Sequence, residues 1–408
     1  MSAFRLVIWA LMALGQLAAW LCWSRRLKKP LARSAVKTVY ILFNFVTAMA
    51  IGQIYFLKLI PPEHLVWTYI YRPALTWHFG HVMWLSVAAI IWLVAVTLRP
   101  WLNRPEKGLP RLFRNKRGGV KVFHFVFLAW LLTMGLVYYS YGVQLGPAEV
   151  RRITVSSPDL PPELEGLRIA HLSDLHYGLG TDLVELDRRL TQTAALRPDL
   201  VIITGDLLDT KASLAQDWRE PLRKLSQVRL GVYGVLGNHD LYTEAPAEEA
   251  QIFDSLGCRI LRDEAVNLPN APITLIGFDD PGTRSQFFLT DPDADLLSFQ
   301  AIAGLPAPAG HYVIVIRHRP QGLAAIAQAG ANLYLAGHTH GGQFQVPWNP
   351  DWNLMTLSTP HTQGTYYLTP TTLIISNGLS SAGLPFRLWA WPEIGLITLT
   401  RGLPQEDN

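Results

Sequence analysis

From Leu167 onward, short apolar runs alternate with segments that have a helical pattern of apolar residues. Such continuous apolar runs are typical of strands that are buried on both faces. Helix-like segments lie between several of them, at Asp182–Leu196, Glu248–Leu256 and Pro320–Gln328. Strands that alternate with helices predict an α/β fold. The runs expected to form strands are Leu167–Leu172, Leu200–Ile203, Val232–Leu236, Ile273–Ile276, Tyr312–Ile316, Leu333–Leu335, Leu373–Ile375 and Gly395–Leu399.

Five of these runs are followed, within a few residues, by side chains that can bind metal ions. Ligands of open α/β sheets gather where the strands end, so these side chains are expected to meet at one site. An Asp-x-His pair alone is common, whereas the blocks Gly-Asn-His-Asp and Gly-His-Thr-His are much more specific. The side chains are Asp174 and His176, Asp206, Asn238 and His239, His318, and His338 and His340.

This set of side chains suits a pair of divalent cations. Two cations about 3.5–4 Å apart can clamp a phosphate, activate a water and stabilise the leaving oxygen. Such a pair needs carboxylates and imidazoles, with one carboxylate shared between the cations. Asp206 is the natural bridge because Gly205 before it lets the backbone approach closely. The ligand types suit Mn, Fe and Zn alike.

The five blocks together resemble the calcineurin-like metallophosphoesterase superfamily, over about residues 165–400. Within it, the chain looks most like the membrane-attached bacterial branch of YkuE-type phosphoesterases. Three further stretches carry that likeness: Gly337–Gln343, Ser376–Leu379, and Leu384–Arg387 with Pro392–Ile394. The resemblance implies a two-sheet β-sandwich flanked by helices, and hydrolysis of phosphate mono- or diesters with two divalent metal ions.

The resemblance also implies a role for each matching residue. One metal would be held by Asp174, His176, Asp206 and His340, and the other by Asp206, Asn238, His318 and His338. His239 would bind no metal. It would instead stabilise the phosphate or protonate the leaving group, and Asp240 would orient it.

Several polar residues near the blocks have two readings. Arg319 stands where many relatives carry Asn or Asp, and is expected to face the substrate phosphate or to be a solvated arginine at a helix start. Arg387 is expected to bind substrate or to pair with an acid. Asp209 is either a carboxylate behind the ligands or a helix-start residue. His171 is expected to be a packed core histidine, and the segment Asp279–Asp293 a surface loop.

The first 142 residues predict an all-α module of four transmembrane helices. Four apolar runs approach the ~20 residues needed to span a bilayer: Phe4–Trp23, Val39–Ile60, His81–Leu98 and Val122–Tyr141. The alternatives are buried core helices or, for the first run, a cleaved signal peptide. We expect a linker over 143–166 and a metallophosphoesterase domain over 167–402.

Charge predicts how this module is oriented. Residues 1–150 contain 17 Lys and Arg and three acids, whereas the remainder contains 18 and 28. The bases cluster in the loops after the first and third runs, which the positive-inside rule places in the cytoplasm. Both termini and the catalytic domain are then extracytoplasmic, in the cell membrane. The high pI reflects these loops and does not indicate nucleic-acid binding.

The anchor suggests a membrane bilayer partner and a phosphate-ester substrate that is lipid-linked. Two other functions stay open. One is a pyrophosphatase for a nucleotide-linked lipid of the UDP-diacylglucosamine type, which would require a cytoplasmic domain. The other is a non-catalytic membrane sensor, although none of the seven ligand positions is lost. The two cysteines, Cys22 and Cys258, form no metal motif or disulfide framework.

Overall fold

The computed structural model describes residues 38, 41, 70–77, 80, 84, 116–178, 180–209, 211–243, 245–281, 307–357, 359–381 and 387–403. Two compact units make up the chain. One consists of Met1–Gly142 with Leu384–Phe386, and the other of Val143–Gly383 with Arg387–Asn408. The second unit contains every block of predicted metal ligands.

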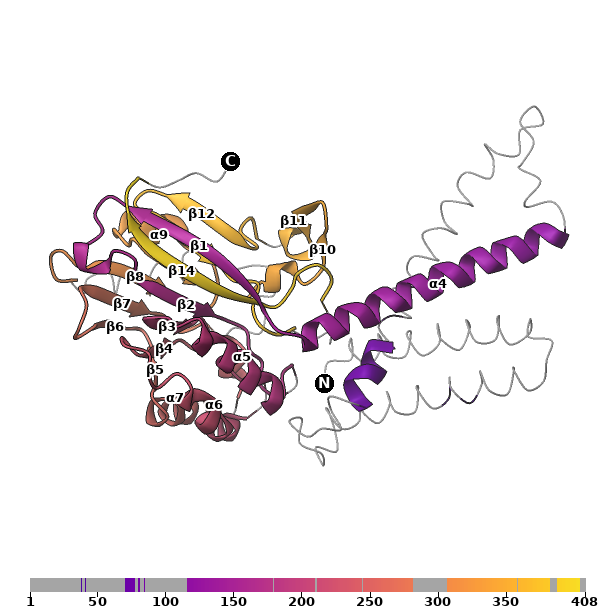
Figure 1. Ribbon diagram of the computed structural model, residues 1–408, viewed down its shortest axis with the longest axis horizontal. Coiled ribbons are helices and arrows are strands. Elements are labelled where there is room, and N and C mark those ends of the chain that lie inside the picture. Colours follow the sequence, from indigo (N-terminus) through magenta and orange to yellow (C-terminus); the bar gives the residue numbers. More distant parts are fainter. Residues whose placement is uncertain are drawn as a thin grey trace. The chain divides into compact units, whose positions relative to one another are not determined.

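Two six-stranded sheets form the second unit (Figure 1). The first has the order β1-β14-β2-β3-β4-β5, and the second the order β12-β13-β9-β8-β7-β6. The strands of the first sheet are β1 Glu149–Ser157, β14 Glu393–Arg401, β2 Arg168–Leu172, β3 Leu200–Ile203, β4 Val232–Gly234 and β5 Cys258–Ile260. Those of the second are β12 Gly364–Leu368, β13 Thr371–Ile375, β9 Leu333–Ala336, β8 Tyr312–Ile316, β7 Ile273–Gly277 and β6 Glu264–Asn267.

Alternating side chains explain why the central strands are apolar throughout. Successive residues of a strand point to opposite faces of the sheet. In β3, Leu200 and Ile202 pack in the core between the two sheets. Val201 and Ile203 pack in the core beneath helices. The predicted burial of these strands on both faces is therefore confirmed.

The helices lie on the outer faces of the two sheets (Figure 1). Helices α5 Leu183–Ala195, α6 Arg219–Arg223 and α7 Pro246–Ser255 share a core with the first sheet. Helix α9 Leu323–Gln328 packs on β8, β9 and β13 of the second. Asp182 caps α5, because its side chain accepts from the Glu185 N–H while the Glu185 side chain accepts from the Asp182 N–H.

Parallel pairing sets where the site can form. Strands β2, β3, β4 and β5 are mutually parallel, as are β7, β8, β9 and β13. Their carboxyl ends therefore lie at a common edge within each sheet. Strand β14 runs antiparallel to β2, and β6 and β12 are antiparallel at the edges of the second sheet.

The structure confirms the predicted α/β fold of two helix-flanked sheets and corrects one boundary. The segment 143–166 is not a linker, because it contains β1, which pairs in parallel with β14 along all nine of its residues. The short hairpin of β10 Gln345–Val346 and β11 Asn349–Asn353 was also not anticipated.

The first three apolar runs of the predicted membrane module lie almost entirely outside the described residues. The fourth falls within α4, which spans Lys116–Leu145. Within the part of the chain that the structure describes, no helix combines the length and hydropathy needed to cross a membrane.

Candidate metal centre

Loops after five strands bring the predicted ligands together. The loop after β2 carries Asp174 and His176, and it lies along the loop after β3. The Asp174 N–H donates to the Gly205 carbonyl at 3.0 Å, and the His176 N–H donates to the Asp206 carbonyl at 2.9 Å. The His338 N–H, after β9, donates to Oδ2 of Asp174 at 3.1 Å. Backbone hydrogen bonds thus join loops from both sheets.

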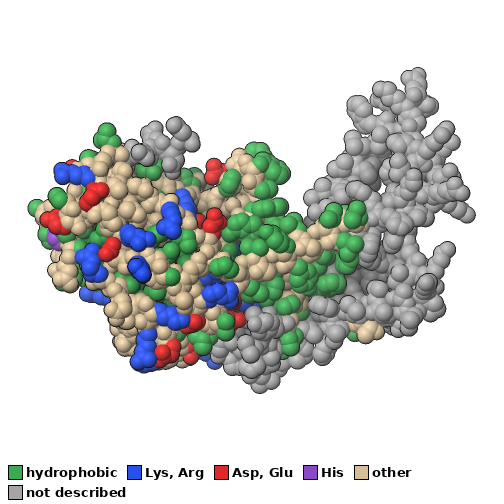
Figure 2. Space-filling view, viewed as in Figure 1, with side chains coloured by type: hydrophobic (Ala, Val, Ile, Leu, Met, Phe, Trp, Pro, Cys, Tyr) green, Lys and Arg blue, Asp and Glu red, His purple; other side chains and the backbone are tan. Residues whose placement is uncertain are grey.

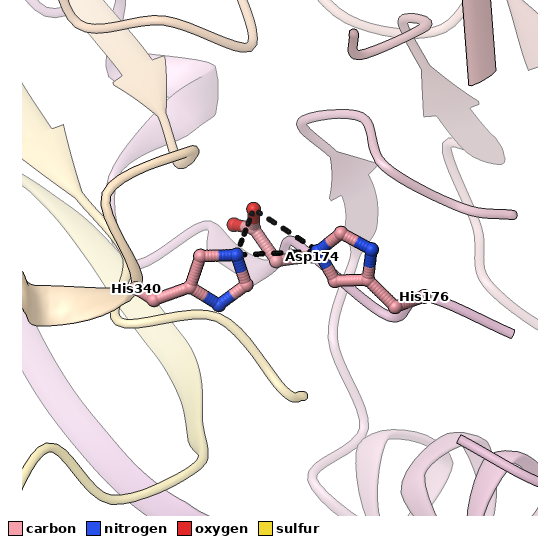
Figure 3. Close-up of side chains that lie close together, drawn as sticks. All are labelled: Asp174, His176 and His340. Atoms are coloured by element: carbon pink, nitrogen blue, oxygen red, sulfur yellow. Dashed lines mark hydrogen bonds and ion pairs between the residues drawn. The ribbon is translucent and has the colours of Figure 1, made fainter. Parts of the chain in front are cut away.

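One group of ligand atoms consists of Asp174, His176 and His340 (Figure 3). Nε2 of His176 lies 3.2 Å from Nε2 of His340, and Oδ1 of Asp174 lies 3.3 Å from Nε2 of His340. All three side chains are buried. Oδ1 of Asp174 has no hydrogen-bond partner, although it is shielded from solvent. A buried acceptor of this kind requires a cation or a proton donor.

A second group forms around Asp206. Oδ2 of Asp206 lies 3.2 Å from Nε2 of His318 and 3.5 Å from Nε2 of His176. Nδ1 of His338 lies 3.1 Å from Nε2 of His318. The side-chain oxygen of Asn238 is buried without a hydrogen-bond partner. Asp206 thus lies between the two groups, as a bridging carboxylate must.

Hydrogen bonds at Nδ1 of His340 and His318 leave Nε2 as the nitrogen that faces the site. Nδ1 of His340 lies 2.9 Å from the Ser380 carbonyl, and Nδ1 of His318 lies 2.8 Å from the Thr204 carbonyl. A carbonyl only accepts, so each Nδ1 carries a proton and each ring turns Nε2 inward, where the neutral form presents a lone pair to a cation. Nε2 of His176 and Nε2 of His340 lie 3.2 Å apart, and the two nitrogens repel unless a cation or a proton lies between them. The residues therefore fit bound cations.

Most ligands have a left-handed backbone. The φ angles of Asp174, His176, Asp206, His338 and His340 lie between 47° and 70°. Residues other than glycine rarely adopt this region, and they cluster at functional sites when they do. The loop hydrogen bonds described above hold these conformations in place.

Glycines let the backbone approach the ligand carboxylates. A Cβ placed on Gly237 would lie 2.2 Å from Oδ1 of Asp206. One on Gly337 would lie 2.5 Å from Oδ2 of Asp174. Any side chain in place of the glycines of the Gly-Asn-His-Asp and Gly-His-Thr-His blocks would thus collide with these carboxylates.

Asp209 contacts two of the site histidines. Its Oδ1 lies 2.7 Å from Nδ1 of His176 and 2.9 Å from Nδ1 of His239, and its Oδ2 accepts from the Gly180 N–H at 2.9 Å. The sequence left its role open, and the structure shows a carboxylate behind the ligands. The only sequence signal was its spacing of three residues from Asp206.

Asp240 does not orient His239, and this prediction is corrected. Its Oδ1 accepts from the Leu208 N–H at 2.8 Å, and its Oδ2 accepts from the Gly237 N–H at 2.7 Å. Both oxygens are therefore engaged by backbone. Asp240 ties the loop after β3 to the loop after β4, and Asp209 takes the role that the resemblance gave to Asp240.

The carboxylates dominate the electrostatics. Burial lowers the pKa of His176, but Asp209, Asp206 and Asp174 raise it to about 9. Burial likewise lowers the pKa of His318, while Asp206 raises it to about 10. The pKa of His239 is raised by Asp206 and Asp209 against the effect of its burial. The centre therefore attracts positive charge, whether as protons or as metal cations.

The two predicted substrate-binding arginines are both buried. The Arg387 guanidinium donates to the carbonyls of Gly378, Ser380, His340 and Asn377. Substrate binding by Arg387 is corrected, because these carbonyls occupy both terminal nitrogens of the guanidinium and the side chain is 0% exposed. Arg319 is not a solvated arginine, since its Nε donates to Oδ2 of Asp280 at 2.6 Å. Substrate contact by Arg319 stays a prediction.

His171 is a core residue, as predicted. Its ring is fully buried in β2, and Nε2 lies 3.0 Å from Oγ1 of Thr204. Burial lowers its pKa to about 3, so the imidazole is neutral. Of the predicted loop Asp279–Asp293, residues 282–293 lie outside the described residues.

The family model described as calcineurin-like phosphoesterase matches residues 167–342. The transmembrane protein with metallophosphoesterase domain of Bos taurus is 32% identical over 264 residues, which are 62% of this chain and 57% of that protein. Its Danio rerio counterpart is 30% identical over 280 residues, which are 67% of this chain and 62% of that protein. The uncharacterized metallophosphoesterase YkuE of Bacillus subtilis is 27% identical over 267 residues, which are 64% of this chain and 89% of that protein.

This chain spans less than two thirds of the length of the two vertebrate relatives. The matched residues include all seven predicted metal ligands and His239. Together with the two mixed sheets, the match identifies the second unit by its family: residues 167–342 form a calcineurin-like phosphoesterase domain.

Proposed function

We propose that this protein hydrolyses phosphate mono- or diesters at a centre that holds two divalent cations. The observation that carries the proposal is the pair of inward-facing Nε2 atoms of His176 and His340, 3.2 Å apart, beside the unpartnered Oδ1 of Asp174. One cation would be held by Asp174, His176, Asp206 and His340, and the other by Asp206, Asn238, His318 and His338. When bound, the pair supplies charge that stabilises the phosphate and lowers the pKa of a water molecule.

The protein's own groups complete the chemistry. His239 is the proposed proton donor to the leaving oxygen, because Asp206 and Asp209 raise the pKa of its imidazole and favour the charged form. Asp209 holds Nδ1, which leaves Nε2 as the proton-bearing atom that can reach the substrate. The side chain of His239 is 32% exposed, so substrate can reach it.

We further propose that the protein is a multi-pass protein of the cell membrane with an extracytoplasmic catalytic domain. The apolar runs and the basic loops of residues 1–141 support this. The vertebrate relatives named as transmembrane proteins are consistent with it. A reporter enzyme fused after Asn408 tests the orientation. Activity of the reporter in the cytoplasm alone would reverse it.

Hydrolysis of bis(4-nitrophenyl) phosphate and 4-nitrophenyl phosphate by the purified full chain, supplied with Mn²⁺, tests the catalytic proposal. The variant Asp206→Ala should lose turnover and metal content together, since it removes the shared ligand. Asp187→Ala, on the exposed side of α5, is the matched control. A wild-type chain that binds no transition metal would contradict this proposal and favour the non-catalytic sensor.

A further inference from the structure

Two exposed tryptophans lie on the hairpin of β10 and β11. Trp348 is 82% exposed and Trp352 is 65% exposed, at the turn and on the second strand. Figure 2 shows hydrophobic side chains gathered over these two strands. Apart from Val346, the rest of the hairpin consists of polar and proline residues, including Asn349, Pro350 and Asp351. A tryptophan at this exposure gives up the free energy of burial unless something covers it.

The hairpin is fixed to the turn that carries a metal ligand. Nε2 of Gln345 donates to the Gly341 carbonyl at 2.8 Å, and Gly341 directly follows His340. At the other strand, a Cβ on Gly342 would lie 2.3 Å from the side chain of Asn353. Trp352 therefore directly precedes Asn353, whose side chain packs against the turn of the predicted ligand His340.

Helix α5 begins with two more exposed apolar side chains, just after the loop that carries the predicted ligand His176. Leu183 is 41% exposed and Val184 is 58% exposed. The Thr181 N–H just before them donates to the carbonyl of the ligand His176 at 2.9 Å. The capping box of Asp182 then fixes the direction in which α5 leaves the site.

We call Leu183, Val184, Trp348 and Trp352 the rim. In the described part of the second unit, six large hydrophobic residues are exposed, and the other two are Leu368 and Leu403. Four of the six thus belong to elements that are joined to turns carrying the predicted ligands His176 and His340. Exposed apolar side chains on elements that adjoin a site indicate contact with an apolar or amphipathic partner.

Helix α5 also connects the rim to the end of α4. Arg188 lies four residues after Val184, on the same face of α5, and its guanidinium donates to the Leu145 carbonyl. Arg189 donates to the carbonyls of Gly146 and Gln144 at 2.6 and 2.7 Å. The fourth apolar run of the sequence ends at Tyr141, only four residues before Leu145. The segment that follows this run is therefore bound to the helix that begins with Leu183 and Val184.

We infer that the rim lies in the headgroup layer of a lipid bilayer and exposes the metal centre to phosphate esters of membrane lipids. Tryptophan favours this layer because its ring is apolar and its N–H is polar. A lipid phosphate lies at the same depth, which suits a centre whose predicted ligands His176 and His340 stand in turns joined to the rim elements. The inference rests on the proposed function and names its substrate class as amphipathic phosphate esters.

Lipid contact is tested by fluorescence quenching of the full chain in phosphatidylcholine vesicles. Subtracting the spectrum of the double variant Trp348→Phe, Trp352→Phe from that of the wild type isolates the emission of the two rim indoles. Bromine atoms on the acyl chains near the headgroup should quench this difference emission. Equal emission with brominated and unbrominated lipid overturns the inference. Indoles that are quenched instead by acrylamide in the aqueous phase would lie in water, which overturns it too.

Substrate presentation is tested with two chromogenic diesters, soluble bis(4-nitrophenyl) phosphate and 4-nitrophenyl hexadecyl phosphate embedded in vesicles. The variant Trp348→Ser, Trp352→Ser should lose about tenfold in kcat/KM on the embedded ester and keep its rate on the soluble one. Leu183→Ser, Val184→Ser gives the same test from the other element if the first variant folds poorly.

The control for both variants is Leu368→Ser, Leu403→Ser, which removes equally exposed apolar groups elsewhere. Loss on both esters alike, or on neither, contradicts presentation by the rim. A wild-type chain that cleaves neither ester refutes the proposed hydrolysis. The quenching measurement still decides the position of the rim in that case.

Discussion

Oδ1 of Asp209 lies 2.9 Å from Nδ1 of His239, and the same oxygen lies 2.7 Å from Nδ1 of His176. One carboxylate thus fixes the ring of a predicted metal ligand and the ring of the proposed proton donor. Metal binding and proton transfer share this contact, so a change at Asp209 should affect both.

The variant Asp209→Asn keeps the shape of the side chain and removes its charge. Metal affinity should fall about 10- to 100-fold, as is typical when a partner of a ligating histidine is lost. Turnover at saturating metal should fall as well, because the pKa of His239 is no longer raised by Asp209. Metal titration and steady-state kinetics measure the two effects. Asp187→Asn serves as control, and unchanged metal affinity in Asp209→Asn would contradict the assignment.

His239→Ala should separate proton transfer from metal binding. Loss of a general acid typically lowers kcat about 10²- to 10⁴-fold. Metal content should stay at the wild-type level, since His239 is not among the seven proposed ligands. His340→Ala is the contrasting variant, because it should lose metal and activity together. Metal analysis beside kcat shows the difference, and a metal-free His239→Ala protein would make this residue a ligand.

Gly237→Ala should damage the centre by crowding. The added Cβ would lie 2.2 Å from Oδ1 of Asp206, so the shared carboxylate must move. Backbone packing leaves Asp206 little freedom, since its Oδ1 also accepts from the His239 N–H at 2.8 Å. We expect metal binding to be lost in a chain that still folds. Gly135→Ala, which has open space around it, is the control for circular dichroism and metal content.

A buried acid pair behind the site should make stability depend on pH. Burial and the charge of Asp240 raise the pKa of Glu249 far above its ordinary value of 4.5. The folded state then binds more protons than the unfolded chain, so the free energy of unfolding falls as pH rises above about 4.5. Glu249→Gln removes the ionisable group and with it this dependence of stability on pH. Its Tm should exceed that of the wild type at about pH 8 and match it at about pH 4, as measured by thermal unfolding.

An equal Tm difference at both pH values would show that Glu249 ionises normally in the folded state. Thr243→Ser is a suitable control for this pair. The Thr243 hydroxyl lies 3.2 Å from Oε2 of Glu249, and serine keeps that hydroxyl while leaving both carboxyl groups unchanged.

The sequence predicted the central strands and the metal-ligand loops because both have strong local causes. Burial on two faces makes β3 and β8 apolar throughout, and their predicted bounds were those of the structure. Strand β1 was missed because its pairing partner, β14, lies more than 200 residues away and its one buried face gives a mixed pattern, Glu-Val-Arg-Arg-Ile-Thr-Val-Ser-Ser. No local signal distinguishes such a strand from an extended linker.

Roles that depend on tertiary contacts were harder to predict. Asp240 adjoins His239 in sequence, yet the chain turns its carboxylate toward the N–H groups of Leu208 and Gly237. Asp209 reaches His239 only because the loops after β3 and β4 lie side by side. Arg387 was expected to face substrate or an acid, but four backbone carbonyls meet at its guanidinium. Proximity in sequence is a poor guide to such contacts.

The left-handed backbone at Asp174, His176, Asp206, His338 and His340 bears on how the centre is loaded. The hydrogen bonds between loops already hold these predicted ligands in place, so the entropy of gathering them is lost when the chain folds. An arriving cation then gains nearly its full coordination free energy, because it orders little backbone. Replacement of one metal ion by another would then change only the bonds to the ion, because the backbone around it keeps its conformation.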